Sequence, residues 1–119
     1  MEIIRERVET RRRVIERVRE WASSLRLRST VALIGSYARG DFNLWSDIDV
    51  VVISDELRGN PVERLRNIDA PPGFEVILLT PQEFKELLKK ENPIAIEFVR
   101  YGVIVRDDYG IRDLVKEYI

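Results

Sequence analysis

The chain has 119 residues, a formal net charge of −1 at pH 7, and neither cysteine nor histidine. This length suits a single domain, residues 1–119, with one hydrophobic core, and the balanced charge gives no indication of direct nucleic-acid binding. The missing residue types exclude disulfides, thiolate chemistry, a Ser-His-Asp triad and histidine-ligated zinc, so catalysis would depend on carboxylates, hydroxyls, lysine, arginine and backbone groups.

The N-terminal segment, residues 2–27, has the pattern of a long amphipathic helix. Its apolar residues recur at three-, four- and seven-residue steps and form a stripe of Ile4, Val8, Ile15, Val18, Ala22 and Leu25. The cluster Arg11–Arg13 could bind phosphate, but we favour a solvated helix face balanced by nearby glutamates. This segment lacks the apolar core of a signal peptide, and no run approaches the roughly 20 apolar residues that span a bilayer. We therefore expect a cytoplasmic protein without a membrane segment.

The rest of the chain mixes short apolar strands with short helices. Strands are predicted at Thr30–Ile34, Ile48–Ile53, Phe74–Leu79 and Gly102–Arg106. Helices are predicted at Ser36–Arg39, after Pro61, from the capping box at Thr80 to about Lys90, at Ile94–Arg100, and from a cap at Asp107 or Asp108 to the C-terminus. Because the helices do not strictly alternate with the strands, the sequence predicts an α+β fold with a small mixed sheet and helices packed on it.

The turn Gly35-Ser36 lies between a predicted strand and a predicted helix. A helix that begins directly after a strand presents backbone N–H groups that bind anions, most often phosphate. Glycine at position 35 would let a ligand approach the backbone closely. Junctions of this kind are frequent and many bind nothing, so the turn alone does not predict a site.

Two aspartates, Asp47 and Asp49, stand at the start of the strand Ile48–Ile53. Side chains two residues apart on a strand point to the same face, so these carboxylates repel unless cations or hydrogen-bond donors offset their charge. Mg²⁺ prefers oxygen ligands and often bridges carboxylates and substrate phosphates. A lone Asp-x-Asp is more often an exposed strand end or a turn, but its position one short loop after Gly35-Ser36 favours a site for a metal and a nucleotide.

A third carboxylate, Glu75, lies at the start of the strand Phe74–Leu79. A glutamate among large apolar residues is costly to bury unpaired. If this strand lies beside Ile48–Ile53, Glu75 can face the two aspartates; the alternative is a solvent-facing residue at a strand end. Asp69, in the preceding loop, is a weaker candidate.

The pattern Gly35-Ser36-x-Ala38-x-Gly40, followed after five residues by Ser46-Asp47-x-Asp49 and an apolar strand, resembles the signature of the polymerase-β-like nucleotidyltransferase superfamily. The short length is similar to that of its minimal nucleotidyltransferases (MNT proteins). The resemblance is sharp over residues 33–53, softer over 74–80 and faint over 94–106. It implies a small mixed sheet with helices packed on one side. The minimal family more often has aspartate where this chain has Glu75, although related transferases use glutamate.

The resemblance also implies a reaction, the attack of an acceptor hydroxyl on the α-phosphate of a nucleoside triphosphate with release of pyrophosphate. Asp47 and Asp49 would bind two divalent ions, normally Mg²⁺. Glu75 would complete this metal site and help to activate the hydroxyl. Gly35 and Ser36 would hold the terminal phosphates of the nucleotide, with ATP as the expected substrate. Such a transfer needs positioning and charge neutralisation more than a protein base, so a chain without histidine can perform it.

Two further motif residues have open roles. Arg39 could add a phosphate contact or be an ordinary surface residue. Ser46 is expected to cap or orient the aspartates rather than to react.

In the minimal family the partner is often a separate helical protein of the HEPN type, and the pair forms a toxin–antitoxin system. We therefore expect an antitoxin that transfers AMP to a hydroxyl on such a toxin. Four aromatic residues could form the interface, although core packing or ordinary exposure is the alternative for each: Phe42, Trp45, Tyr101 and Tyr109. Two other functions remain open. One is a binding module that neutralises its partner by contact, and the other is a small-molecule transferase of the antibiotic-modifying kind, completed by a homodimer.

Overall fold

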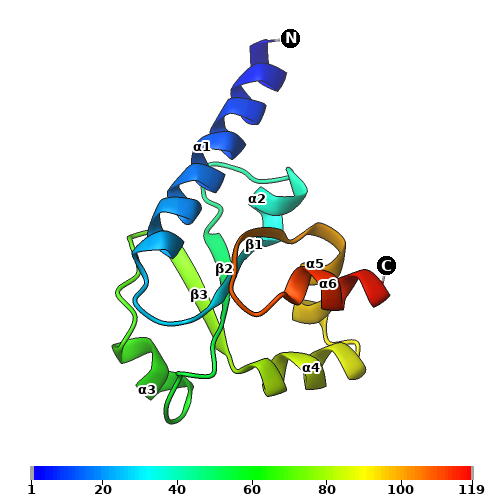
Figure 1. Cartoon of the computed structure of the whole chain (residues 1–119). Coiled ribbons are helices and arrows are strands. Elements are labelled where there is room, and N and C mark those ends of the chain that lie inside the picture. Colours follow the sequence, from blue (N-terminus) through cyan, green and yellow to red (C-terminus); the bar gives the residue numbers. More distant parts are fainter. Residues whose placement is uncertain (1, 119) are drawn as a thin grey trace.

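The structure, a computed structural model, describes residues 2–118 (Figure 1). Its helices are α1 (Glu2–Ser24), α2 (Gly35–Arg39), α3 (Pro61–Arg66), α4 (Pro81–Lys89), α5 (Pro93–Tyr101) and α6 (Ile111–Val115), with a final 3-10 turn at Lys116–Tyr118. Its strands are β1 (Thr30–Ile34), β2 (Ile48–Ile53), β3 (Phe74–Leu79) and β4 (Val103–Asp107). The four predicted strands are confirmed, the last of them one residue later than predicted. None of the described helices is long and apolar enough to cross a bilayer.

The four strands form one mixed sheet in the order β3-β2-β1-β4. Strand β1 pairs antiparallel with both β2 and β4, and β2 pairs parallel with β3. The register places Ile34 opposite Asp49, and Asp49 beside Glu75. The predicted α+β fold with a small mixed sheet is therefore confirmed, and the segments that carry the candidate residues meet at one end of the sheet.

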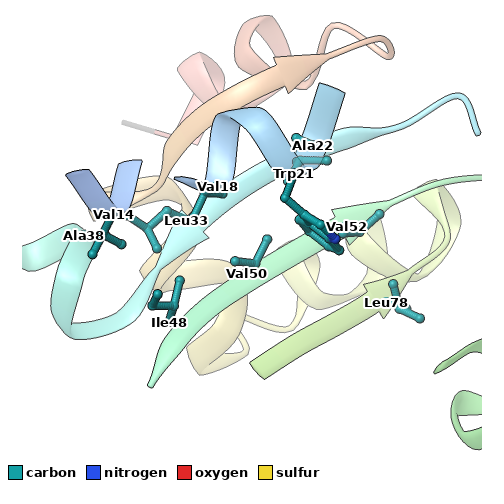
Figure 2. Close-up of a cluster of buried hydrophobic side chains, with 11 residues drawn as sticks. Val14, Val18, Trp21, Ala22, Leu33, Ala38, Ile48, Val50, Val52 and Leu78 are labelled. Atoms are coloured by element: carbon teal, nitrogen blue, oxygen red, sulfur yellow. The ribbon is translucent and has the colours of Figure 1, made fainter. Parts of the chain in front are cut away.

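Helices cover both faces of this sheet, not one face as the family resemblance implied. Alternate strand residues face α1 on one side, where the cluster in Figure 2 includes Val18, Trp21, Leu33, Val50 and Val52. The residues between them face α4, α5 and α6, in a second cluster of Ala32, Ile34, Val51, Ile53, Phe84, Leu88, Ala95, Phe98, Ile111 and Val115. Burial on both faces explains why the strands are continuous apolar runs rather than alternating ones.

Helix α1 packs on the sheet only through its C-terminal half. Val18 and Ala22 of the predicted stripe are buried, and Trp21, which lies outside that stripe, is buried with them. Ile4 and Val8 are exposed, because the first turns of α1 extend beyond the sheet (Figure 1). The predicted stripe therefore faces the core over only part of its length.

The arginines of α1 have two different environments. Arg12 and Arg13 lie near Glu9 on an exposed helix face, as expected. Arg11 does not, because its guanidinium donates to the carbonyl oxygens of Tyr37 and Ala38, both at 2.9 Å. These carbonyls belong to the last turn of α2, where the helix dipole favours a cation. Arg11 therefore holds α2 against α1.

Of the two predicted helix caps, the one at Thr80 is confirmed and the one at Asp107 or Asp108 is not the N-cap residue. The capping box is confirmed, since the Thr80 hydroxyl accepts from the backbone N–H of Glu83 and the Glu83 carboxylate accepts from that of Thr80. At α6 the N-cap residue is Gly110, yet the Asp107 carboxylate accepts from the first two helical N–H groups, those of Ile111 and Arg112. Asp107 therefore does stabilise this helix start, from three residues before the N-cap.

Candidate functional site

The predicted site residues lie at the end of the sheet where β1 ends and β2 and β3 begin. Gly35 and Ser36 open α2 directly after β1. Asp47 directly precedes β2, and Asp49 is the second residue of that strand. Glu75 is the second residue of β3 and is the register neighbour of Asp49. Three separate segments are thus joined by strand pairing at one end of the sheet.

Gly35 and Asp49 form the closest link between the two parts of the motif. The backbone of Gly35 has φ +76°, a left-handed conformation that favours glycine. A Cβ atom at this position would overlap Oδ2 of Asp49. The positive φ and the lack of space for a Cβ atom therefore both favour glycine at position 35. The lack of space also shows that the turn lies against the Asp49 carboxylate.

Asp49 is the carboxylate whose environment differs most from water. It is half-buried, and this burial raises its pKa to about 6, an effect to which the charges of Glu75 and Asp47 add. The charge of Arg39 acts in the opposite direction. Asp47 and Glu75 are exposed. A cation bound beside Asp49 would relieve this repulsion.

The carboxylates suit a hard divalent cation, but they do not form a complete cage. Within residues 2–118, no three acidic, histidine or cysteine side chains are close enough together to hold a metal ion by themselves. Mg²⁺ commonly takes one or two carboxylates and completes its shell with water and substrate phosphates. Asp47 and Asp49 are therefore the residues that could hold the ion. The role of Glu75 as a third ligand stays a prediction.

A pocket of about 330 Å³ opens beside Gly35 and Asp49. Its polar wall contains Ser36 and Arg39 of α2 and Glu97 of α5, and its apolar wall is formed by Ile34, Ile77, Pro93 and Ile94. No side chain caps the N-terminus of α2, which opens onto this pocket. The pocket thus combines a polar turn, a carboxylate and an apolar wall, which is the usual lining of a site for a small molecule.

Ser46 and Asp69 lie elsewhere than predicted. The Ser46 hydroxyl accepts from the backbone N–H of Asn43 at 2.9 Å, and the Asn43 side chain accepts from the N–H of Trp45 at 2.8 Å. Ser46 therefore stabilises the turn of its own loop and does not orient the aspartates. Asp69 lines a different pocket, with Leu27 and Arg64, and is not part of this site.

The four candidate interface aromatics differ in exposure. Phe42 is buried and stacks on Tyr37, with 4.5 Å between ring centroids, so it is a structural residue. Tyr109 is partly buried, and its hydroxyl donates to the Asp55 carboxylate at 2.6 Å. Trp45 is 90% exposed and its neighbour Leu44 is 95% exposed. Tyr101, on α5, is also exposed.

Arg39 and Glu97 were not expected to interact. Arg39 donates to Glu97 on α5 and to Asp41 in the loop after α2. Sequence patterns could not identify Glu97, because α5 meets α2 only in the folded chain. Charge pairing on one helix has a spacing signal, whereas pairing between helices has none.

Comparison with protein-family models matches residues 11–119 to the nucleotidyltransferase domain. Among solved structures, a provisionally assigned nucleotidyltransferase from Sulfolobus solfataricus has 22% identity and a TM-score of 0.56, over 82% of this chain and 84% of that chain. A toxin–antitoxin structure with AMP-PNP has 17% identity and a TM-score of 0.57, over 87% of this chain and 82% of that chain. At these identities the two structures establish the fold alone. A search of curated proteins finds no significant match.

Proposed function

The chain belongs to the nucleotidyltransferase domain family, and from this membership we propose that it is a Mg²⁺-dependent enzyme that transfers AMP from ATP to a hydroxyl on a partner protein. The observation that carries the proposal is the direct approach of Gly35 to the Asp49 carboxylate. It joins a turn suited to phosphate and a carboxylate suited to a metal in one pocket. A bound nucleoside triphosphate needs both.

The reaction makes one bond and breaks one bond at the α-phosphate. The oxygen of the acceptor hydroxyl attacks the α-phosphorus, and the bond from that phosphorus to the bridging oxygen of pyrophosphate breaks. Asp47 and Asp49 would hold Mg²⁺, which would supply charge neutralisation and a lower pKa for the attacking hydroxyl. Glu75 accepts the hydroxyl proton, a role supported by its exposed position beside Asp49 in the register. The N–H groups of Gly35 and Ser36 hold the departing phosphates.

The exposed loop before Asp47 supports a protein as the acceptor. Leu44 and Trp45 are neighbours in the chain and are 95% and 90% exposed, and aromatic side chains are enriched in protein–protein interfaces. Their place in the chain, directly before the carboxylate pair, would bring a bound protein close to the site. One structural relative is a toxin–antitoxin assembly with a nucleotide analogue, so we propose a helical HEPN-type toxin as partner and an antitoxin role for this chain.

A second function, neutralisation of the partner by contact alone, is favoured by one observation. Leu44 and Trp45 present an exposed apolar surface that does not depend on the carboxylates. If Mg²⁺ does not bind with the nucleotide, the exposed loop would still bind a partner.

Titration calorimetry with a non-hydrolysable ATP analogue separates these two functions. We expect binding that requires Mg²⁺ and is lost in the Asp47→Asn/Asp49→Asn double variant. Asp41→Asn, which changes an exposed carboxylate near the motif, is the control and should bind like the wild type. If the nucleotide analogue binds equally well without Mg²⁺ and in the double variant, the result would contradict the enzymatic proposal and favour neutralisation by contact alone.

A further inference from the structure

Arg39 and Glu97 form an ion pair at the edge of the pocket. Arg39 Nη1 donates to Glu97 Oε1 at 2.5 Å, and Nε donates to Asp41 Oδ2 at 3.1 Å. The side chains of Arg39 and Glu97 are each 30% exposed, whereas that of Asp41 is 64% exposed. Glu97 is therefore the better shielded of the two carboxylates.

Glu97 projects from a helix that is firmly anchored. Its neighbours Ala95 and Phe98 belong to the core and are 1% and 2% exposed. Phe98 packs against Phe84 of α4, with ring centroids 4.7 Å apart. Asp41, in contrast, lies in an irregular loop. A carboxylate on α5 can hold the long arginine side chain in one orientation, which a carboxylate in a loop does less well.

The second carboxylate oxygen of Glu97, Oε2, lowers the stability of the fold. Oε2 is buried and has no hydrogen-bond partner in the described part of the chain. A buried carboxylate oxygen without a donor lowers stability, and an apolar residue of similar size would avoid that cost. The packing of α5 therefore does not require a glutamate at this position, whereas the ion pair with Arg39 does.

Arg39 lies beside the turn that is proposed to hold phosphates. It is the last residue of α2, and it lines the same pocket as Gly35, Ser36 and Asp49. A guanidinium has five N–H donors, and its two hydrogen bonds to protein carboxylates leave donors for phosphate oxygens. An arginine held in place before the ligand arrives loses less conformational entropy on binding.

We propose that Glu97 is a positioning residue, which fixes the Arg39 guanidinium at the pocket so that Arg39 binds the triphosphate of the nucleotide. This inference rests on the proposed function. Glu97 does not touch the substrate and acts only through Arg39. The expected effect of its loss is weaker binding of the triphosphate without loss of the fold.

A double-mutant cycle with calorimetry tests this dependence. In the otherwise wild-type chain, Glu97→Gln should weaken binding of the Mg²⁺–ATP analogue by about tenfold, the loss expected when a charge-assisted phosphate contact is no longer held in place. In an Arg39→Gln background the same change should have an effect below about twofold, because Glu97 has nothing left to position. Asp41→Asn is the matched control and should also change affinity by less than about twofold. An equal loss in both backgrounds, or no loss, would overturn the proposal.

A second measurement examines the pair in the protein without nucleotide. Rotation of the Arg39 guanidinium should be slow, so that its Nη protons give separate NMR signals, assigned by their absence in Arg39→Gln. These signals should persist in Asp41→Asn and merge in Glu97→Gln. Ordered signals in Glu97→Gln would overturn the positioning role even if the nucleotide did not bind. Absent binding by the wild type with ordered Arg39 signals would instead contradict only the proposed function.

Discussion

The backbone of Gly35 lies against the carboxylate of Asp49, so closely that a Cβ atom on residue 35 would overlap Oδ2. Gly40, at the other end of α2, also has a positive φ, +93°, but a Cβ there would meet no atom within 4 Å. The two glycines that flank this short helix therefore carry the same backbone constraint, and only one of them also carries the contact with the site.

This difference predicts distinct effects of alanine at the two positions. Gly40→Ala should lower the free energy of unfolding by about 1 kcal/mol, from backbone strain alone, and should retain Mg²⁺-dependent nucleotide binding. Gly35→Ala should cost more, about 2–3 kcal/mol, and should abolish binding because Asp49 must move. Urea unfolding and calorimetry on both variants measure these effects. Equal nucleotide affinity in the two variants would show that the contact is irrelevant to the site.

The raised pKa of Asp49 predicts a gain in stability when its charge is removed. Its pKa is about 6 in the folded chain, against about 3.9 in an unfolded one, so its contribution to stability is full below pH 4 and is lost as the pH rises through 6. For a fully buried carboxyl, this pKa difference would lower the free energy of unfolding by about 3 kcal/mol between pH 4 and pH 7. Asp49 is only half-buried, so solvent screening reduces the expected loss to about 1 kcal/mol. Asp49→Asn should therefore unfold at higher urea than the wild type at pH 7.

The difference between Asp49→Asn and the wild type should shrink as the pH falls from 7 to 4, because the wild-type carboxyl becomes protonated. Asp113→Asn, at an exposed carboxylate on α6, is the control for the removal of one carboxylate charge. A variant that is less stable than the wild type at pH 7 would mean that Asp49 is stabilised by its neighbours.

Arg11 predicts that α1 supports the site from a distance. Arg11→Ala should lower the free energy of unfolding by about 1–3 kcal/mol, because two carbonyl oxygens at the end of α2 lose a charged donor. Since α2 carries the phosphate turn, nucleotide affinity should also fall. Arg12→Ala, which removes an exposed ion pair with Glu9, should leave the urea midpoint unchanged. Matching unfolding curves for the two variants would contradict this role.

Loss of the Trp45 side chain should weaken partner binding without weakening nucleotide binding. Trp45→Ala removes a side chain that is 90% exposed, so the free energy of unfolding should change by less than about 0.5 kcal/mol. Affinity for the Mg²⁺–ATP analogue should stay within about twofold of the wild type, whereas transfer of labelled AMP to a co-purified HEPN-type toxin should fall at least about tenfold. Leu65→Ala, at an exposed apolar residue of α3, is the control and should transfer AMP like the wild type. Unchanged transfer by Trp45→Ala would move the interface elsewhere.

The strands and the motif residues were predictable because their signals are local. Short apolar runs rich in residues that favour strands gave β1, β2 and β3 to the residue, and the capping box gave the start of α4. The Gly-Ser and Asp-x-Asp pattern also indicated the family that the domain match confirms. These features depend on neighbours within a few residues.

The errors concern features that depend on distant parts of the chain. Helical periodicity placed Ile4 and Val8 on an apolar stripe, but it contains no information on where the sheet beneath the helix ends. The partners of Arg11 and Arg39 lie on α2 and α5, and only the packing of these helices brings them together. The assignment of Ser46 failed because its hydroxyl accepts from the backbone N–H of Asn43 in the preceding turn.

The parallel pairing of β2 and β3 also places the first part of the segment that connects them far from the site. Both strands begin at the site, so the chain leaves β2 at the opposite end of the sheet, and α3 lies there (Figure 1). Residues Arg58, Gly59 and Asn60, just before α3, are exposed in that region. Arg58 is therefore a convenient position for a fluorophore or an affinity tag, from which partner and nucleotide binding can be followed without a label near the pocket.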